Sequence, residues 1–207
     1  LKTFNKRELY KEENATKETF KQALSSNTIV HVATHSEVSD DDPLFSSIYL
    51  TSRDSKSELV SDQALYAYEL FDAELNTDLL VLNSCSSGSG SFLQGAGIRG
   101  ISRVLRYAGA KSLALNLWVV NDKLASDFST RFYTAINDGK SKSESFRAAK
   151  IAQIESGNAN PHYWGAFMML GNSSPIVAEK SRARPSIITL GIGLLIGLGV
   201  YARRKSG

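Results

Sequence analysis

The chain contains one cysteine, Cys85, at a position that can support nucleophilic chemistry. It ends the apolar segment 78–84 and is followed by a loop rich in serine and glycine, SSGSGSFLQG. We expect a thiol at a strand end, close to free backbone N–H groups, to be partly exposed and acidified, which would favour the reactive thiolate. The alternative interpretation is a small structural thiol in an apolar strand.

His35 is the histidine best placed to act as a base toward Cys85. It directly follows the β-branched, apolar segment 28–34, which predicts a buried strand. Functional groups in parallel α/β sheets gather at the carboxyl ends of the strands, so we expect His35 and Cys85 to lie near each other. A histidine there can deprotonate the thiol and later protonate a leaving amine.

The other two histidines, His31 and His162, suggest no metal site. Four strand residues separate the backbones of His31 and His35 by about 13 Å, too far for both rings to bind one zinc ion. We interpret His31 as a buried, hydrogen-bonded strand histidine and His162 as a loop residue. The chemistry considered for Cys85 requires no metal and no cofactor.

The segment GAGIRG, residues 95–100, matches the dinucleotide-binding pattern G-x-G-x-x-G and offers an alternative function. That site needs its first glycine at the strand end, where the backbone meets the pyrophosphate. Gly95 instead comes ten residues after Cys85, although Asp122 could serve as the ribose carboxylate. The other interpretation is a loop followed by a helix that packs closely on the sheet.

The elements that must position these residues are predicted by hydrophobic periodicity and capping signals. Strands are expected at 28–34, 46–52, 78–84, 111–120 and 163–171. Helices are expected from Thr16 to about Ser25, over 62–70, over 97–109, after an Asp122 cap, and from a Ser141–Glu144 capping box to about Glu155. Strands that alternate with helices indicate an α/β domain with a mostly parallel sheet covered on both faces.

Composition limits the classes of protein to which the chain can belong. A length of 207 residues with 42% hydrophobic residues supports one sizeable core. The net charge of +3 and the lack of a basic stripe with aromatic residues argue against nucleic-acid binding. One cysteine excludes an intrachain disulfide. The chain opens on Leu1 without a signal-peptide pattern, and we interpret it as the C-terminal piece of a longer protein.

The C-terminal segment 186–202 carries no charged residue over about 17 positions, the lower limit for crossing a bilayer. We predict that it is a single-pass transmembrane anchor that holds the protein at a membrane, on a side that the flanking charges do not assign. The predicted organisation is therefore a globular domain over 1–171, a linker over 172–185, the anchor and a basic tail over 203–207.

Several motifs, taken in order, resemble the CHAT domain, a bacterial member of the caspase, separase and metacaspase group of cysteine peptidases. They are HVATHS (31–36), LLVLNSCSSGSG (79–90), GIRGISRVLRYAGAKSLALNLWVVND (97–122), FYTAI (132–136) and PHYWGAFMMLG (161–171). The resemblance covers residues 16–171. It implies a caspase-like fold, with helices on both faces of a mostly parallel sheet, and thiol protease activity with a His35–Cys85 dyad.

The resemblance also implies how the reaction and its control are organised. The backbone N–H groups of Ser36 and Cys85 would hold the oxyanion, and position 36 is usually glycine in the family. CHAT domains commonly follow tetratricopeptide repeats, which implies an upstream, partner-sensing region in the same chain. A protease-like interaction scaffold without turnover is the competing function, motivated by Ser36 and Asn83.

Substrate contacts follow from the same resemblance. Asn83 takes the position, two before the cysteine, that is typically acidic in metacaspases and reads a basic P1 side chain. Asn116, Leu117 and Trp118 would offer a strand edge to an extended protein or peptide substrate. Asp122 would add an acidic contact; core packing of Trp118 and helix capping by Asp122 are the structural alternatives.

Overall fold

The computed structural model describes residues 8–39, 41–52, 60–83, 85–86 and 96–176. The elements, with η for 3-10 helices, are η1 (Glu12–Asn14), α1 (Lys17–Ser26), β1 (Ile29–Val32), β2 (His35–Glu37), η2 (Pro43–Phe45), β3 (Ser47–Tyr49), α2 (Val60–Gln63), β4 (Ala64–Tyr66), η3 (Ala67–Leu70), β5 (Leu79–Leu82), β6 (Cys85–Ser86), α3 (Ala96–Tyr107), β7 (Ser112–Asn116), α4 (Asp122–Asn137), α5 (Lys142–Glu155), α6 (Pro161–Trp164) and β8 (Phe167–Gly171).

The main sheet has the strand order β1-β5-β7-β8. Strands β1, β5 and β7 are parallel, and β8 runs antiparallel to β7. Every residue of β5 and β7 is buried, as expected for central strands covered on both faces. The predicted α/β class with a mostly parallel sheet is confirmed.

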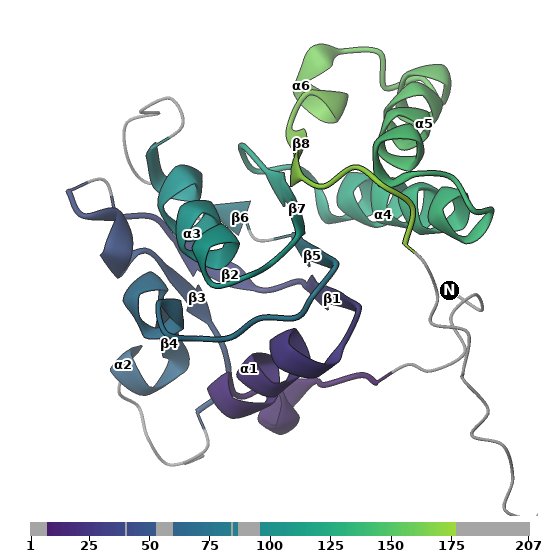
Figure 1. Ribbon diagram of the computed structural model, residues 1–207. Helices are drawn as coiled ribbons and strands as arrows, with labels where there is room; N and C mark the ends of the chain where they lie inside the picture. Colours follow the sequence, from purple (N-terminus) through teal and green to yellow (C-terminus); the bar gives the residue numbers. More distant parts are fainter. Residues whose placement is uncertain (1–7, 40, 53–59, 84, 87–95, 177–207) are drawn as a thin grey trace, which may run out of the picture. The chain divides into compact units, whose positions relative to one another are not determined.

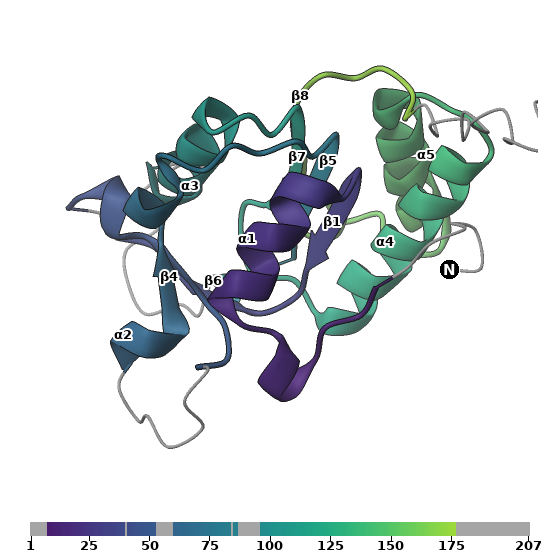
Figure 2. The same ribbon diagram turned by 60° about the horizontal axis from the view of Figure 1, so that its bottom comes forward.

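Helices cover both faces of this sheet (Figures 1 and 2). Side chains alternate along β5, so that Leu80 and Leu82 pack in one core with residues of α1 and α3. Leu79 and Val81 face the other way and pack with residues of α4 and α5. The two apolar layers explain why the strand sequence is continuously apolar rather than alternating.

The helix ends follow local capping chemistry. Thr16 caps α1, and Ser141 with Glu144 forms the predicted capping box of α5. The predicted cap of α4 was wrong by one position, because Asn121 accepts the capping hydrogen bond and Asp122 is the first helical residue. An amide oxygen caps a helix as well as a carboxylate does, so the sequence alone did not separate the two.

Two predicted strands are shorter than expected. The segment 111–120 forms a strand only over Ser112–Asn116. The segment 163–171 forms a strand only from Phe167, because α6 precedes it. Asn160 caps this short helix and Pro161 occupies its first position, an arrangement that favours a helical turn. His162, predicted in a loop, therefore lies in α6.

A second sheet, with the order β4-β3-β2-β6, was not predicted. Strand β3 is antiparallel to both β2 and β4, whereas β2 and β6 are parallel. The predicted helix over 62–70 was wrong, because only its start belongs to α2 and the chain then forms β4 and η3. Pairing of Leu65 with Ile48 in a buried sheet outweighs the helical spacing of this segment.

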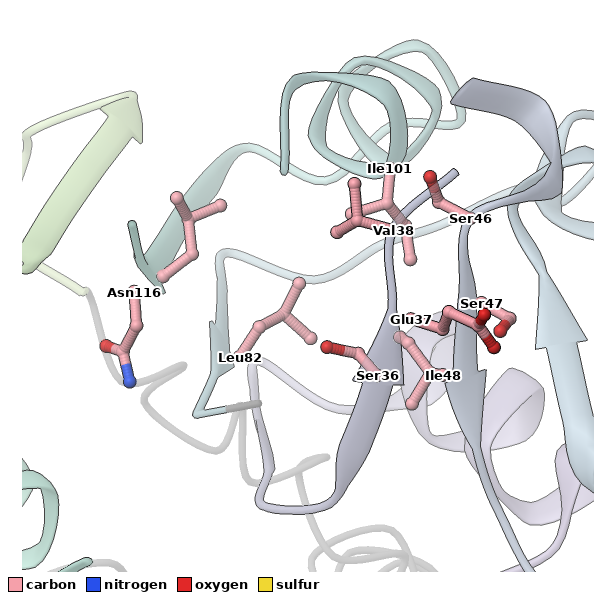
Figure 3. Close-up of a pocket in the computed structure, with 10 residues that line it drawn as sticks. Ser36, Glu37, Val38, Ser46, Ser47, Ile48, Leu82, Ile101 and Asn116 are labelled. Atoms are coloured by element: carbon pink, nitrogen blue, oxygen red, sulfur yellow. The ribbon is translucent and has the colours of Figure 1, made fainter. Parts of the chain in front are cut away.

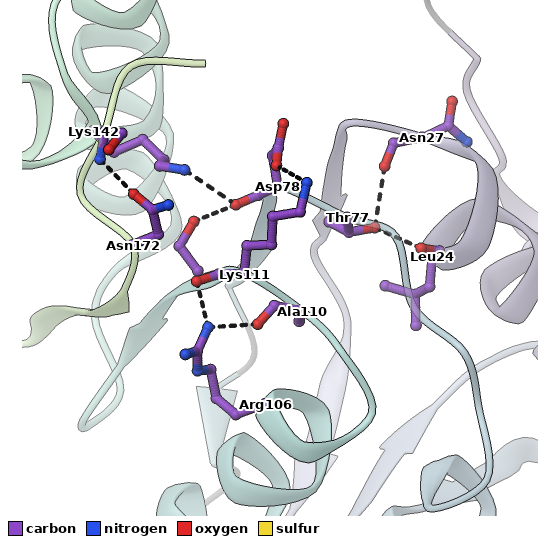
Figure 4. Close-up of polar contacts among 11 residues, drawn as sticks. Leu24, Asn27, Thr77, Asp78, Arg106, Ala110, Lys111, Lys142 and Asn172 are labelled. Carbon is purple, nitrogen blue, oxygen red and sulfur yellow. Dashed lines mark hydrogen bonds and ion pairs between the residues drawn. The ribbon is translucent and has the colours of Figure 1, made fainter. Parts of the chain in front are cut away.

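Polar contacts join the elements at the amino end of the main sheet (Figure 4). The buried Thr77 hydroxyl donates to the carbonyl oxygens of Leu24 and Asn27, at 2.7 and 3.1 Å. Just before β5, the Asp78 carboxylate lies 2.7 Å from Lys111 Nζ at the start of β7. These contacts fix the strand starts, so the opposite, carboxyl ends have defined positions.

Within the described ranges, no helix combines the length and apolar character needed to cross a bilayer. The predicted anchor over 186–202 and the tail over 203–207 lie outside the described residues, as does the linker beyond residue 176. Membrane attachment therefore stays a prediction from sequence.

Candidate functional site

The backbones of His35 and Cys85 are direct neighbours in the second sheet. Strands β2 and β6 pair in parallel, with His35 opposite Cys85 and Ser36 opposite Ser86. Neighbouring strands lie about 4.8 Å apart, which sets the spacing of the two chains at this point. The structure therefore brings together the two residues that sequence reasoning selected for nucleophilic chemistry.

This pairing continues the register of the main sheet. Val32, the last residue of β1, is opposite Leu82, the last residue of β5. Three residues further along each chain, His35 is opposite Cys85. Between the two pairs, the Asn83 N–H donates to the Val32 carbonyl at 2.8 Å. Burial of β1 and β5 fixes their register, and the same register carries over to the candidate site.

The side chains of β2 alternate between the surface and the interior. His35 and Glu37 are exposed, whereas Ser36 between them is buried. The Glu37 carboxylate accepts a hydrogen bond from the Tyr49 hydroxyl at 2.5 Å. That bond is the main reason why the pKa of Tyr49 is raised. An exposed His35 ring is accessible to a macromolecular substrate.

A cleft lies between the carboxyl ends of the main sheet and the second sheet (Figure 3). Its lining includes Ser36, Leu82 and Asn116. Figure 3 shows Leu82 between the other two. Asn116 is 4% exposed, and its Oδ1 has no hydrogen-bond partner within the described parts of the chain. The cleft thus borders Ser36, the residue next to His35.

Asn83 belongs to a polar network between β1, β5 and α4. Its Nδ2 lies 2.9 Å from Ser129 Oγ and 3.3 Å from His31 Nε2. The Tyr133 hydroxyl lies 2.7 Å from His31 Nδ1. An amide nitrogen can only donate, so Nε2 accepts, and a neutral His31 carries its proton on Nδ1. Desolvation lowers the pKa of His31, which favours this neutral form.

The prediction for His31 was half right. The ring is hydrogen-bonded on both nitrogens, as expected, but the residue is exposed rather than buried. The ring sits close to Tyr133 at a centroid distance of 5.7 Å, so crowding rather than full burial reduces its hydration. Among the described residues, none donates to Asn83 Oδ1, which leaves this oxygen as an acceptor.

Sequence reasoning missed the contribution of α4 to this network. Ser129 and Tyr133 are both buried on the face of α4 that packs against the main sheet. Their spacing of four residues places the two hydroxyl groups on one side of the helix. Polar groups at that spacing within an apolar helical face were a signal that could have identified them.

The predicted substrate strand has one edge already occupied. Asn116 pairs with Phe167 of β8, and the Leu117 N–H donates to the Ala166 carbonyl at 2.7 Å. On the other edge, pairing with β5 ends at Leu115 opposite Leu82. Only this second edge remains for an extended peptide in the described part of the structure, and the binding role stays a prediction.

Trp118 and Asp122 both have local structural roles. Trp118 Nε1 donates to the His162 carbonyl at 2.9 Å, and the two rings stack at a centroid distance of 6.0 Å. This contact joins the end of β7 to α6. Asp122 is exposed in the first turn of α4, where a carboxylate is favoured by the helix dipole. The predicted substrate contacts of Trp118 and Asp122 therefore stay predictions.

In the described part of the chain, the candidate dinucleotide site does not directly follow β5. Strand β5 ends at Leu82, β6 intervenes, and α3 begins at Ala96. Gly97 and Gly100 are therefore helical residues, whereas Gly95 lies outside the described residues. In the described part of the chain, no three His, Cys, Asp or Glu residues are grouped as metal ligands would be.

Comparison with known proteins gives one family. The sequence model of the CHAT domain matches residues 2–172, which is most of the chain. No curated protein matches the sequence.

Proposed function

The chain belongs to the CHAT domain family, a caspase-like, peptidase-related family, and from this premise we propose that it is a cysteine endopeptidase with His35 and Cys85 as its catalytic dyad. The observation that carries the proposal is the pairing of His35 opposite Cys85 in strands β2 and β6. It supports the proposal because a thiol and its base must lie within reach of each other.

The proposed reaction forms and then hydrolyses a thioester. His35 takes the proton of Cys85, and the thiolate sulfur attacks the scissile carbonyl carbon of the substrate. The imidazolium then gives its proton to the leaving amine as the C–N bond breaks. Water, deprotonated by His35, attacks the thioester and releases the acid and the thiol. We assign the oxyanion to the backbone N–H groups of Ser36 and Cys85.

The substrate is proposed to be a protein or peptide in extended conformation. The edge of β7 beyond Leu115 would pair with its backbone, near Asn116, Leu117 and Trp118. Asn83 would contact the P1 side chain. Because its amide nitrogen is engaged by His31 and Ser129, the oxygen Oδ1 is the atom offered, which suits a P1 group with an N–H or O–H donor.

Peptide-library cleavage by the full chain tests the proposed activity. Wild type should cleave, Cys85→Ala and His35→Ala should abolish cleavage, and the P1 residues recovered should carry hydrogen-bond donors. Cleavage that survives in Cys85→Ala would refute the dyad. An upstream, partner-sensing region and a membrane anchor are proposed to regulate and locate the enzyme, so the full-length protein should be compared with the chain alone.

A catalytically silent scaffold is the second candidate, and one observation favours it. Ser36, where the family usually has glycine, is buried in β2 and lines the cleft. Its side chain would crowd an oxyanion bound at the same residue. A thiol-reactive probe separates the two functions: a dyad thiolate labels quickly, with a pH profile set by His35, whereas a scaffold thiol labels at the rate of an ordinary free cysteine.

A further inference from the structure

The amide of Asn83 can take two orientations of nearly the same shape. Its Nδ2 lies 2.9 Å from Ser129 Oγ and 3.3 Å from His31 Nε2. Rotation of the amide by a half-turn about the Cβ–Cγ bond exchanges Nδ2 with Oδ1, two atoms of nearly equal size. After this rotation, Oδ1 would face Ser129 and His31, and Nδ2 would take the place that Oδ1 has now.

The protonation state of His31 determines which orientation is favourable. The neutral ring accepts a hydrogen bond at Nε2, and Asn83 Nδ2 is the donor that it needs. The protonated ring carries hydrogen on both nitrogens, so its Nε2–H would face the N–H of Nδ2 and requires an acceptor instead. Oδ1 is that acceptor once the amide has rotated. Binding of a proton by His31 therefore favours the rotated amide.

The other members of the network accommodate both orientations. The Ser129 hydroxyl can accept from Nδ2 or donate to Oδ1. The Tyr133 hydroxyl oxygen lies 2.7 Å from His31 Nδ1, which carries a proton in both states of the ring and donates to it. Neither contact opposes the rotation, so the bond between Asn83 and His31 determines the orientation.

The groups packed against His31 set the pH at which the amide rotates. Tyr133 is the titratable group of α4 that contacts the ring, and burial raises its pKa, so it stays neutral in neutral and weakly acidic solution. Asn83 of β5 is neutral, and Val30 and Val32, which flank His31 in β1, are apolar. Among the described residues, desolvation rather than a charged neighbour lowers the pKa of His31 from 6.5. The rotation is therefore expected below pH 6.5.

We propose that His31 is a positioning residue that sets the P1 preference of the site through Asn83. With a neutral His31, Asn83 presents Oδ1 and selects P1 side chains that donate a hydrogen bond. With a protonated His31, Asn83 presents Nδ2 and selects P1 side chains that accept one, such as a carboxylate or a sulfoxide. This inference rests on the proposed function in one respect, the contact between Asn83 and the P1 side chain.

Three peptides that differ only at P1 test the proposal with the full chain. Lysine at P1 donates a hydrogen bond, methionine sulfoxide accepts one through its added oxygen, and methionine is the apolar reference. The sulfoxide is uncharged, so attraction between an imidazolium and a carboxylate does not contribute to its cleavage. We would measure kcat/KM between about pH 8 and about pH 5. The ratios to methionine are compared, because they cancel the titration of the proposed dyad.

The sulfoxide-to-methionine ratio should rise at least about fivefold as the pH falls through the pKa of His31, the factor that one hydrogen bond typically contributes. The lysine-to-methionine ratio should fall over the same range. His31→Gln does not titrate and should make both ratios independent of pH, whereas the matched control His162→Gln, in α6, should keep the wild-type changes. Constant ratios in the wild type, or changes that survive in His31→Gln, would overturn the proposal.

A binding measurement separates this proposal from the peptidase function. If the wild type cleaves none of the peptides, the full chain with Cys85→Ala is titrated with labelled forms of the same peptides, and binding is followed by fluorescence anisotropy. The same change of relative affinity with pH would then support the role of His31 although the peptidase function had failed. Absence of binding by all three peptides would overturn the proposal.

NMR of the wild type replaces the variant if circular dichroism shows that His31→Gln is unfolded. The side-chain amide signals of Asn83 should shift with the same midpoint as the ring signals of His31, because one proton controls both groups. Amide signals that do not follow the titration of His31 would overturn the proposal.

Discussion

Asn83→Asp should raise the pKa of His31, because it puts a negative charge beside the imidazole. In the wild type, Asn83 Nδ2 lies 3.3 Å from His31 Nε2 and 2.9 Å from Ser129 Oγ. Desolvation lowers the pKa of the histidine there. The aspartate has nearly the shape of the asparagine, but its carboxylate accepts a hydrogen bond from Nε2–H and so stabilises the protonated ring.

The geometry sets the size of the change. Two unit charges about 4 Å apart attract by about 1 kcal/mol in water and about 4 kcal/mol at the effective dielectric constant near a protein surface. His31 is exposed, so the lower end of this range applies. Since about 1.4 kcal/mol corresponds to one pKa unit, we expect a rise of about one unit.

NMR titration of the His31 ring protons in the full chain measures this shift directly. Asn158→Asp is the matched control, because Asn158 is half-buried just after the turn that follows α5, and its amide contacts Ser156 rather than a histidine. The control should leave the titration of His31 unchanged. If Asn83→Asp raises the pKa no more than the control does, or lowers it, the inferred contact between Asn83 and His31 is refuted.

Three further predictions concern stability, measured by urea unfolding of the full chain. Folding lowers the pKa of His31 from 6.5, so as the pH falls below 6.5 the unfolded state binds the proton before the folded state does. The free energy of unfolding should therefore decrease as the pH falls below 6.5. His31→Gln should remove this part of the pH dependence of the free energy of unfolding. Gly109→Ala should lower the free energy of unfolding by about 2–5 kcal/mol, because φ is +114° and the new Cβ would meet a backbone carbonyl oxygen at 2.6 Å. Gly139→Ala, where φ is +81° and the space around the new Cβ is open, should lower it by only about 1–2 kcal/mol. Equal losses in the two variants would contradict the close approach at Gly109. Thr77→Val should cost about 1–3 kcal/mol by removing a buried hydroxyl that donates to two carbonyl groups, whereas Thr134→Val on an exposed helix face should cost well under 1 kcal/mol.

The main sheet and its long helices could be predicted because their sequences carry strong, local patterns. The apolar segment that forms β5 is buried at every residue. Ser141 and Glu144 form the cap that their spacing predicted. These signals depend on residues close together in the chain, so no knowledge of tertiary contacts was needed.

Of the second sheet, only the strand over 46–52 was predicted, and β3 forms there over Ser47–Tyr49. The other strands of this sheet have no pattern of their own. Strand β4 is three residues long, and its pairing with β3 depends on a segment about 17 positions earlier in the chain, as for Leu65 with Ile48. The same limit applies to the candidate site. Strand ends predicted that His35 and Cys85 would be near each other, but their direct pairing and the role of Ser129 from α4 needed the tertiary structure.

The shared register of the two strand pairs has a consequence for how this family can evolve. The spacers 33–34 and 83–84 have equal length, and this equality keeps His35 opposite Cys85. An insertion in one spacer would be tolerated only with a matching insertion in the other. The chain segments that follow Glu37 and Ser86 carry no such constraint on their length. Among descendants of a common ancestor, the two spacer lengths should therefore be inherited as a pair, while the later loops diverge freely in length.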